Sequence, residues 1–253
     1  MAQQSKSQRK GARADLVLVE RGLVDSRTRA QALILAGKVF SVERRIEKAG
    51  ETVREDTPLE VRGQDHPWVS RGGLKLDHAL TEFDIDVSGA VCLDVGASTG
   101  GFTDVLLTRG AARVYAVDVG HGQFAWKLRN DERVVVLERT NARYLTVAEV
   151  PEPVDMIVCD ASFIGLETVL PAALSLAAPG ARLVALIKPQ FEVGKGQVGK
   201  GGVVRDPALH EAVCERIRAW LDGLPDWAVL GITDSPITGP EGNREFLIAA
   251  VHG

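Results

Sequence analysis

The segment VCLDVGASTGGF, residues 91–102, joins an apolar run of strand length to a group of closely spaced glycines. Glycine adopts backbone conformations that other residues avoid, so Gly96, Gly100 and Gly101 allow a strand to turn sharply into a helix. The free N–H groups at the start of that helix suit a carboxylate or a phosphate. The spacing matches neither GxGxxG nor GxxxxGK[ST], which argues against a dinucleotide and a nucleoside triphosphate. We therefore expect a ligand-binding turn in an α/β protein.

Beyond this loop, apolar runs of strand length alternate with helical segments. Strands that are apolar throughout are typical of a parallel sheet covered by helices on both faces. A connection rich in Pro and Gly separates the last two runs, which allows them to form an antiparallel pair. The predicted strands are residues 91–97, 113–119, 133–138, 154–160, 182–188, 227–233 and 245–251, and the predicted helices are residues 74–83, 102–109, 122–129, 166–178 and 207–222.

Charge divides the 253-residue chain unevenly, although its composition is that of an ordinary globular protein, 45% apolar and 25% charged. Residues 1–62 carry 13 Lys and Arg against 9 Asp and Glu, whereas residues 63–253 carry 17 against 25. A basic segment on an acidic body indicates a module that faces nucleic acid. We expect a disordered basic tail at 1–12, a compact unit at 13–62, a linker at 63–73 and a larger domain at 74–253.

Several classes of protein are disfavoured by what the sequence lacks. Cys92, Cys159 and Cys214 lie far apart without CxxC spacing, and the histidines show no ligand spacing, so we expect neither disulfides nor a metal site. The most apolar long window, residues 169–187, is interrupted by Pro, Gly and Arg, whereas a membrane span needs about 20 apolar residues. The N-terminus has no apolar stretch like that of a signal peptide. We expect a cytoplasmic protein with no direct membrane role.

Charged side chains lie at the ends of several predicted strands, where open α/β sheets bind their ligands. Asp94 precedes the glycine loop, Asp118, Asp160 and Lys188 end three other runs, and Glu245 opens the last. A single charge at a strand end is usually solvated. This concentration of charge at one edge instead predicts a chemical site.

The pattern DxGxxxGG at residues 94–101 resembles the first motif of Rossmann-like methyltransferases that use S-adenosylmethionine. In that family the loop wraps the methionine end of the cofactor, and the acid that ends the second strand, here Asp118, binds the ribose hydroxyls. Asp118 follows Asp94 by one strand–helix–strand unit. The resemblance implies cofactor contacts from Asp94, Gly96, Ser98, Thr99, Gly100, Gly101, Phe102, Asp118 and Asp160, and from Asn141 toward the adenine.

Lys75, Asp160, Lys188 and Glu245, in this order, resemble the K-D-K-E quartet of the FtsJ-type ribose 2′-O-methyltransferases, which implies a catalytic role for all four. The reaction is an in-line displacement at a sulfonium carbon, and the attacking hydroxyl must lose its proton. A lysine accepts that proton only if its pKa falls from about 10.4 toward neutrality. Burial and a neighbouring cation lower a lysine pKa, whereas neighbouring carboxylates oppose this. Lys188 is therefore either the base or a residue that positions the hydroxyl while water takes the proton.

The segment RADLVLVERGLVDSRTRAQALILAGKVF, residues 13–40, resembles the S-four RNA-binding domain. Its residues LVLVERGL fit a helix or a strand, Asp25 or Ser26 offers a helix N-cap, and Gly37 offers a helix end. The following FSVERRIEKAGETVRED departs from the family pattern. Glycines and lysines also crowd the long loop at residues 190–206. The candidate RNA contacts are Arg13, Arg27, Arg29 and Lys38 in the module and Arg71, Arg139, Arg143, Lys195 and Lys200 in the rest of the chain.

The order of these motifs resembles the TlyA family from about residue 13 to residue 251. The resemblance implies a seven-stranded, mostly parallel methyltransferase sheet behind a small α+β RNA-binding domain. It also implies methylation of the ribose of cytidine in ribosomal RNA of assembled subunits. We further expect a monomer with no DNA partner. Three alternatives remain: a non-catalytic RNA-binding or assembly factor, a small-molecule methyltransferase, and a membrane-active haemolysin, a name given to this family as well.

Overall fold

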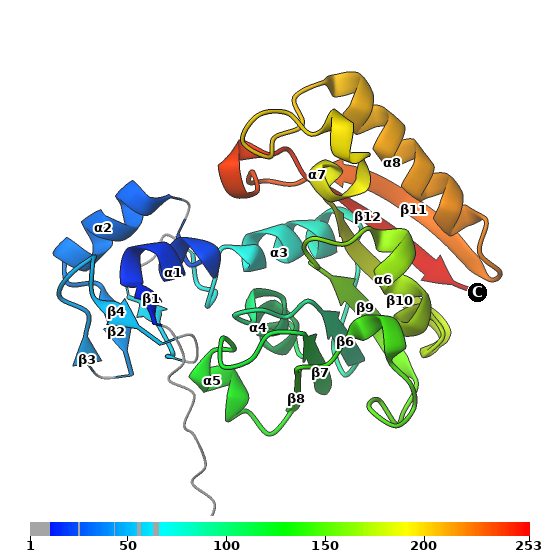
Figure 1. Ribbon diagram of the computed structural model, residues 1–253. Helices are drawn as coiled ribbons and strands as arrows, with labels where there is room; N and C mark the ends of the chain where they lie inside the picture. Colours follow the sequence, from blue (N-terminus) through cyan, green and yellow to red (C-terminus); the bar gives the residue numbers. More distant parts are fainter. Residues whose placement is uncertain (1–10, 25, 43, 55–56, 63–65) are drawn as a thin grey trace, which may run out of the picture.

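A seven-stranded sheet forms the centre of the larger part of the molecule, as the computed structural model of residues 11–24, 26–42, 44–54, 57–62 and 66–253 shows (Figure 1). Five strands are parallel, and β12 is antiparallel to both of its neighbours. The α/β fold and the antiparallel terminal pair are thus confirmed. In spatial order the strands are β11 (Trp227–Asp234), β12 (Phe246–His252), β10 (Ala177–Ile187), β9 (Val154–Cys159), β6 (Val91–Val95), β7 (Arg113–Asp118) and β8 (Val134–Glu138).

Helices cover both faces of this sheet, and each face has its own apolar core. Successive strand residues point to opposite faces, so Leu93 and Ile157 belong to one core while Cys92 and Met156 belong to the other. This double burial explains why the strands are apolar at nearly every position. The first face is covered by α6 (Leu166–Leu174), α8 (Pro207–Asp222) and the 3-10 turn η1 (Ala142–Tyr144), and the second by α3 (Gly72–Glu82), α4 (Gly101–Thr108) and α5 (Trp126–Arg129).

Three predicted boundaries were wrong. The helix predicted at 122–129 is only α5, because the backbone amide of Gly122 donates to the carboxylate of Glu138 and holds the preceding residues in a loop. The helix predicted at 166–178 ends at Leu174, and β10 begins at Ala177 with an irregularity in its register before Arg182. The helix after the linker begins at Gly72, two residues early, because Gly73 packs against Trp68 in a space with no room for a Cβ atom.

The N-terminal part folds around a separate core that includes Leu18, Ile34, Val39 and Ile46. The segment left open between helix and strand is a helix. Ser26 caps the second helix by accepting the amide of Arg29 at 3.2 Å, whereas Asp25 lies outside the described residues. Gly37 follows that helix at φ +69°, as predicted. The elements are β1 (Ala12–Arg13), α1 (Ala14–Glu20), α2 (Arg27–Leu35), β2 (Val39–Ser41), β3 (Arg44–Arg45), β4 (Thr52–Val53) and β5 (Glu60–Val61).

The predicted bounds of the N-terminal unit can be compared with the structure at both of its ends. The expected disordered tail runs too far, because Ala12 pairs with Val53 in a two-stranded sheet; residues 1–10 lie outside the described residues. At the other end, residues 63–65 of the predicted linker also lie outside the described residues. The N-terminal part touches the glycine loop directly, since the Thr99 hydroxyl donates to the carbonyl of Arg21 at 3.0 Å in a buried contact.

Candidate active site

The glycine loop joins β6 to α4 at the carboxyl edge of the sheet, and its backbone conformation requires glycine. Gly96 has φ +83°, and a Cβ atom there would come within 2.9 Å of the backbone of Ala161. Gly100, at the start of α4, has φ +98°, and a Cβ atom there would come within 2.5 Å of Leu128. The loop thus packs so closely against its neighbours that no side chain fits at these two positions. The same lack of side chains lets a ligand approach the loop backbone.

Asp118 ends β7 and fixes the loops on either side of it. Its two carboxylate oxygens accept the backbone amides of Ser98 and Gly120, both at 2.7 Å. A small cavity of about 10 Å³ adjoins this carboxylate and is lined also by Phe124 and Glu138. The predicted acid at the second strand end therefore lies beside the glycine loop, at a pocket edge.

Asp94 lies beneath the loop and is fully buried. One of its oxygens accepts the hydroxyl of Thr103 at 2.6 Å, and the other, Oδ1, has no hydrogen-bond partner among the residues that the structure describes. Burial raises the pKa of Asp94 to about 7, and the nearby carboxylates of Asp160 and Asp118 add to this rise. A half-satisfied carboxyl group at this depth leaves one acceptor for a donor that approaches from the loop.

The four residues of the predicted quartet come together in two ion pairs. Nζ of Lys75, in α3, lies 2.6 Å from Oε2 of Glu245, which precedes β12. Nζ of Lys188, directly after β10, lies 2.6 Å from Oδ1 of Asp160, directly after β9. All four line one cavity of about 140 Å³, together with Gly96, Ala97, Ser98, Thr99, Gly101 and Phe102 of the loop.

The pKa of Lys188 shifts in the direction opposite to the one that a catalytic base requires. Burial lowers the pKa of Lys188, but the carboxylates of Asp160 and Glu245 raise it more, so this pKa lies above its ordinary value. Burial raises the pKa of Asp160, but the positive charges of Lys188 and Lys75 lower it by more, so the net shift of this pKa is downward. In this structure the pKa of Lys188 is therefore not lowered toward neutrality, and its raised pKa favours the ammonium form.

A glycine loop, a strand-end acid and this lysine–carboxylate quartet occupy one edge of the sheet. A family model described as FtsJ-like methyltransferase matches residues 68–252, most of the chain. The chain belongs to the FtsJ-like methyltransferase family. The predicted enzyme class is thereby confirmed.

Relatives of this FtsJ-like methyltransferase cover most of the chain. It is 52% identical over 238 residues to the Mycobacterium tuberculosis protein named 16S/23S rRNA (cytidine-2′-O)-methyltransferase TlyA, covering 94% of this chain and 88% of that one. A solved Streptococcus thermophilus structure named "Putative hemolysin" has 41% identity and TM-score 0.80, covering 96% and 89% of the two chains. A Listeria monocytogenes structure named as an S-adenosylmethionine dependent methyltransferase, at 12% identity, TM-score 0.54 and coverage of 73% and 100%, shares the fold.

Three residues of the FtsJ-like domain that follow members of the quartet escaped the sequence analysis, and Ser162 among them lines the cavity. The Ser162 hydroxyl accepts from Lys188 at 2.9 Å, and Gln190 donates to Glu245 at 3.5 Å. Phe163 is 89% exposed, has φ +65° and lies 4.9 Å from the ring of Phe191. Each follows a strand-end residue of the quartet by two or three positions, a proximity that could have indicated them.

The side chains of two predicted cofactor residues have hydrogen-bond partners within the protein. Thr99 lines the cavity, but its hydroxyl already donates to Arg21 of the N-terminal part. Asn141 is exposed, caps η1 by accepting the amide of Arg143, and is absent from the lining of the two cavities beside the loop.

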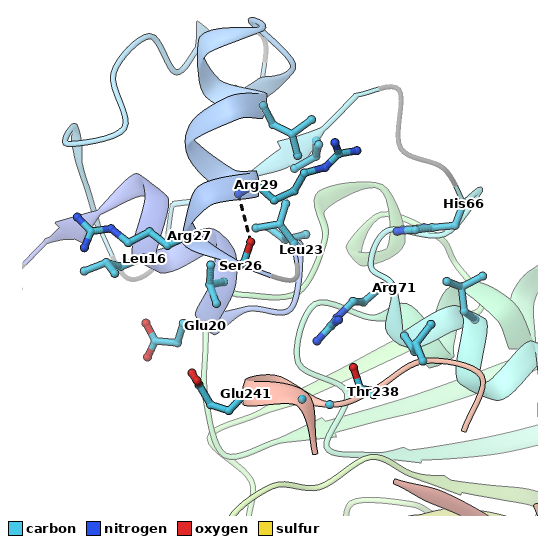
Figure 2. Close-up of a pocket in the computed structure, with 18 residues that line it drawn as sticks. Leu16, Glu20, Leu23, Ser26, Arg27, Arg29, His66, Arg71, Thr238 and Glu241 are labelled. Carbon is cyan, nitrogen blue, oxygen red and sulfur yellow. Dashed lines mark hydrogen bonds between the residues drawn. The ribbon is translucent and has the colours of Figure 1, made fainter. Parts of the chain in front are cut away.

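The predicted RNA contacts fall into separate groups. Arg13 and Arg27 both bind Asp15, at 2.9 Å, and the hydrogen bond from Arg13 helps to hold the pKa of that carboxyl well below its usual range. Arg29 and Arg71 line a cleft of about 1090 Å³ between the N-terminal helices and the loop before β12 (Figure 2). Lys38, Arg139, Arg143 and Lys200 are exposed, and the side chain of Lys195 lies outside the described residues.

Proposed function

We propose that this protein transfers the methyl group of S-adenosylmethionine to the ribose 2′-hydroxyl of cytidine in ribosomal RNA. The observation that carries the proposal is the quartet: four charged side chains from four elements converge beside the glycine loop. The 52% identical M. tuberculosis relative bears the name of that activity. The match to this relative covers both the FtsJ-like domain and the basic N-terminal part, and we therefore propose ribosomal RNA as the substrate of this chain as well.

The residues around the loop fit S-adenosylmethionine. Gly96 and Ser98 line the cavity beside the quartet, and Asp118, next to the glycine loop, would accept the ribose hydroxyls of the cofactor. Oδ1 of Asp94 is a buried acceptor that the described residues leave unpaired, which suits a cationic ligand nearby. The cofactor, when bound, supplies a methyl group on a positively charged sulfur.

The quartet then acts on the RNA hydroxyl. The Lys188 ammonium, held between Asp160 and Ser162, is a donor that can fix the 2′-oxygen for in-line attack. Lys75 is held by Glu245 across the cavity and supplies a second donor. Because the pKa of Lys188 is raised, we assign it a positioning role, and the hydroxyl proton leaves to water.

RNA recognition is assigned to the N-terminal part together with the rim of the domain. We propose that residues 13–62 form an S-four-like RNA-binding domain, joined by a linker to a methyltransferase domain that reaches residue 253. Its exposed Arg27 and Arg29 lie on α2, and Arg71 faces them across the large cleft (Figure 2). We propose that the substrate is an assembled ribosomal subunit, read by a monomer in the cytoplasm.

The proposal is tested by transfer of labelled methyl from S-adenosylmethionine to unmodified small subunits, large subunits and protein-free ribosomal RNA. We expect label on at least one subunit and loss of that label in Lys188→Met. No label on any substrate, from protein that is folded and binds the cofactor, would contradict the proposal and favour a non-catalytic RNA-binding factor.

The role of Lys188 is tested by comparing Lys188→Arg with Lys188→Met. An arginine keeps a positive donor but cannot act as a base near neutral pH. We expect the Met variant to lose about 10²- to 10³-fold in kcat, the cost of one oriented donor, and the Arg variant to retain clearly more. Equal inactivity of the two variants, with cofactor binding intact, would instead identify Lys188 as the base.

A further inference from the structure

A second cleft, separate from the catalytic cavity except at Thr99, lies between the N-terminal part and α5. Its volume is about 520 Å³, within the range of pockets that hold small ligands. β5 and the residue that follows it, Arg62, form one wall, the linker residue Trp68 forms another, and Trp126 with Lys127 forms a third. Thr99, a buried residue of the glycine loop, lines both hollows, so the two hollows are neighbours at this loop.

The walls of this cleft are tied together by hydrogen bonds. The buried carboxylate of Asp104 accepts the backbone amide of Val69 at 2.8 Å and the Nζ of Lys127 at 3.0 Å, which joins the linker to α5. The amide of Ala125 donates to the carbonyl of Thr99 at 3.0 Å, which joins α5 to the glycine loop. The cleft is therefore preformed, and ligand binding there requires little free energy to order its walls.

The side chains in the cleft suit a nucleotide. The indole of Trp126 is 61% exposed, although an indole of this size is normally covered. Aromatic faces of this kind stack on unpaired bases of single-stranded RNA. Lys127 and Arg62 supply cations for a phosphate. The ammonium of Lys127 is 58% exposed beside its partner Asp104, and Arg62 is 40% exposed, pairs with Glu60 at 3.4 Å and lies 4.0 Å from the ring centre of Phe40.

We propose that this cleft holds one unpaired nucleotide of the RNA substrate, other than the methylated one, with its base stacked on Trp126 and its phosphate near Lys127 and Arg62. The proposal rests on the proposed function, because it assigns a second contact to the same substrate. It favours RNA over an apolar peptide because two cations flank the aromatic face and because the cleft adjoins the catalytic cavity at Thr99.

The test compares Trp126→Leu with Trp126→Phe. Both substitutions replace an exposed side chain, so both variants should fold, and Phe keeps an aromatic face. The measurement is the dissociation constant for the unmodified ribosomal subunit that the wild type methylates, with S-adenosylmethionine binding as a control. We expect the Leu variant to bind the subunit about 5- to 150-fold more weakly, the loss of one base–aromatic stack, and the Phe variant to bind within about threefold of the wild type.

A photochemical crosslink from Trp126 to the bound subunit identifies the occupant. We expect a crosslinked nucleotide at a different position from the methylated cytidine. Equal subunit affinity of the Leu and Phe variants, or a crosslink from Trp126 only to a ribosomal protein, would overturn the inference while leaving the methyltransferase proposal intact. A wild-type protein that neither binds nor methylates either subunit would instead remove the proposed function on which the inference rests.

Discussion

Lys75 and Glu245 lie 170 positions apart in the sequence, yet their charged atoms meet at 2.6 Å with side chains only 7% and 0% exposed. A buried charge that keeps its partner is tolerated, whereas one that loses it is strongly destabilising. The ion pair thus has two roles. It places an ammonium group beside the catalytic cavity, and it joins α3 to the start of the antiparallel strand β12.

Breaking this pair from one side should cost more than removing it altogether. We expect Lys75→Met to lower the free energy of unfolding by about 3–5 kcal/mol, because it leaves the buried Glu245 carboxylate unpaired. The double variant Lys75→Met, Glu245→Gln should recover a large part of that loss. Urea unfolding of the wild type, both single variants and the double variant measures the coupling, and purely additive effects would contradict the account.

Asp94 should make stability depend on pH. Its pKa in the folded protein is raised from 3.8 to about 7, so between these values the folded state holds a proton that the unfolded state has released. Its contribution to stability is therefore present at low pH and is lost as pH rises through about 7. Asparagine imitates the neutral carboxyl group and does not titrate.

The measurement compares the thermal unfolding of the wild type and Asp94→Asn at pH 5.5 and 8.5. We expect the variant to gain stability relative to the wild type as pH rises, because only the wild type ionises a buried group. A difference between the two proteins that stays constant across this range would show that Asp94 does not titrate there.

At the scale of elements, the short helix α7 (Pro189–Glu192) holds the loop that follows β9. The carboxylate of Glu192 accepts the amide of Leu166 at 2.8 Å, at the start of α6, and binds Arg216 of α8 at 2.8 Å. The loop fixed in this way carries Ser162, the partner of Lys188. The helices α6, α7 and α8 thus meet at a single carboxylate, beside the loop that carries a partner of Lys188.

Glu192→Ala should loosen this loop. It leaves the amide of Leu166 without its acceptor, which costs about 1–3 kcal/mol for a group of this burial. We also expect kcat for methyl transfer to fall more than the KM for RNA changes, because the loop positions Ser162 rather than the RNA chain. Arg216→Ala, which leaves the Leu166 amide bonded, is the matched control and should affect kcat less. An unchanged kcat in the Glu192 variant would argue against this positioning role.

At the scale of the molecule, the arrangement of a basic N-terminal part beside the carboxyl edge of the sheet predicts electrostatic RNA binding. Each phosphate contact releases counterions, so affinity should fall with salt, and removal of one contact should reduce the slope by about 0.9. We expect this reduction for Arg29→Gln and for Arg139→Gln. Arg182 lies in β10 opposite Met156 of β9, before the carboxyl ends of both strands, so Arg182→Gln should leave the slope unchanged. Equal slopes in all three variants would place the RNA elsewhere.

The strand pattern and the site were predictable to different degrees. Apolar runs predicted all seven strands, because strands buried on both faces leave a continuous signal. The end of α6 and the irregular start of β10 were not predictable, since the change from helix to strand depends on pairing with β9. The quartet could be proposed from residue order, but the pairing of Lys75 with Glu245 depends on the tertiary fold. The raised pKa of Lys188 follows from the balance of burial and two carboxylates, which the sequence does not give.

The cleft at Trp126 illustrates the same limit. The sequence predicted a helix through this residue but gave no sign that its indole stays exposed. The indole lines a cleft whose opposite wall comes from the N-terminal part, a position that depends on the tertiary fold (Figure 1).

The central claim is methylation of a cytidine ribose, and it is tested most directly by nucleoside mass spectrometry of ribosomal RNA after reaction of unmodified subunits with the protein and S-adenosylmethionine. The account predicts 2′-O-methylcytidine, formed by the wild type and lost in Lys188→Met. A methyl group on the base of cytidine, on another nucleoside, or on no RNA at all would contradict it.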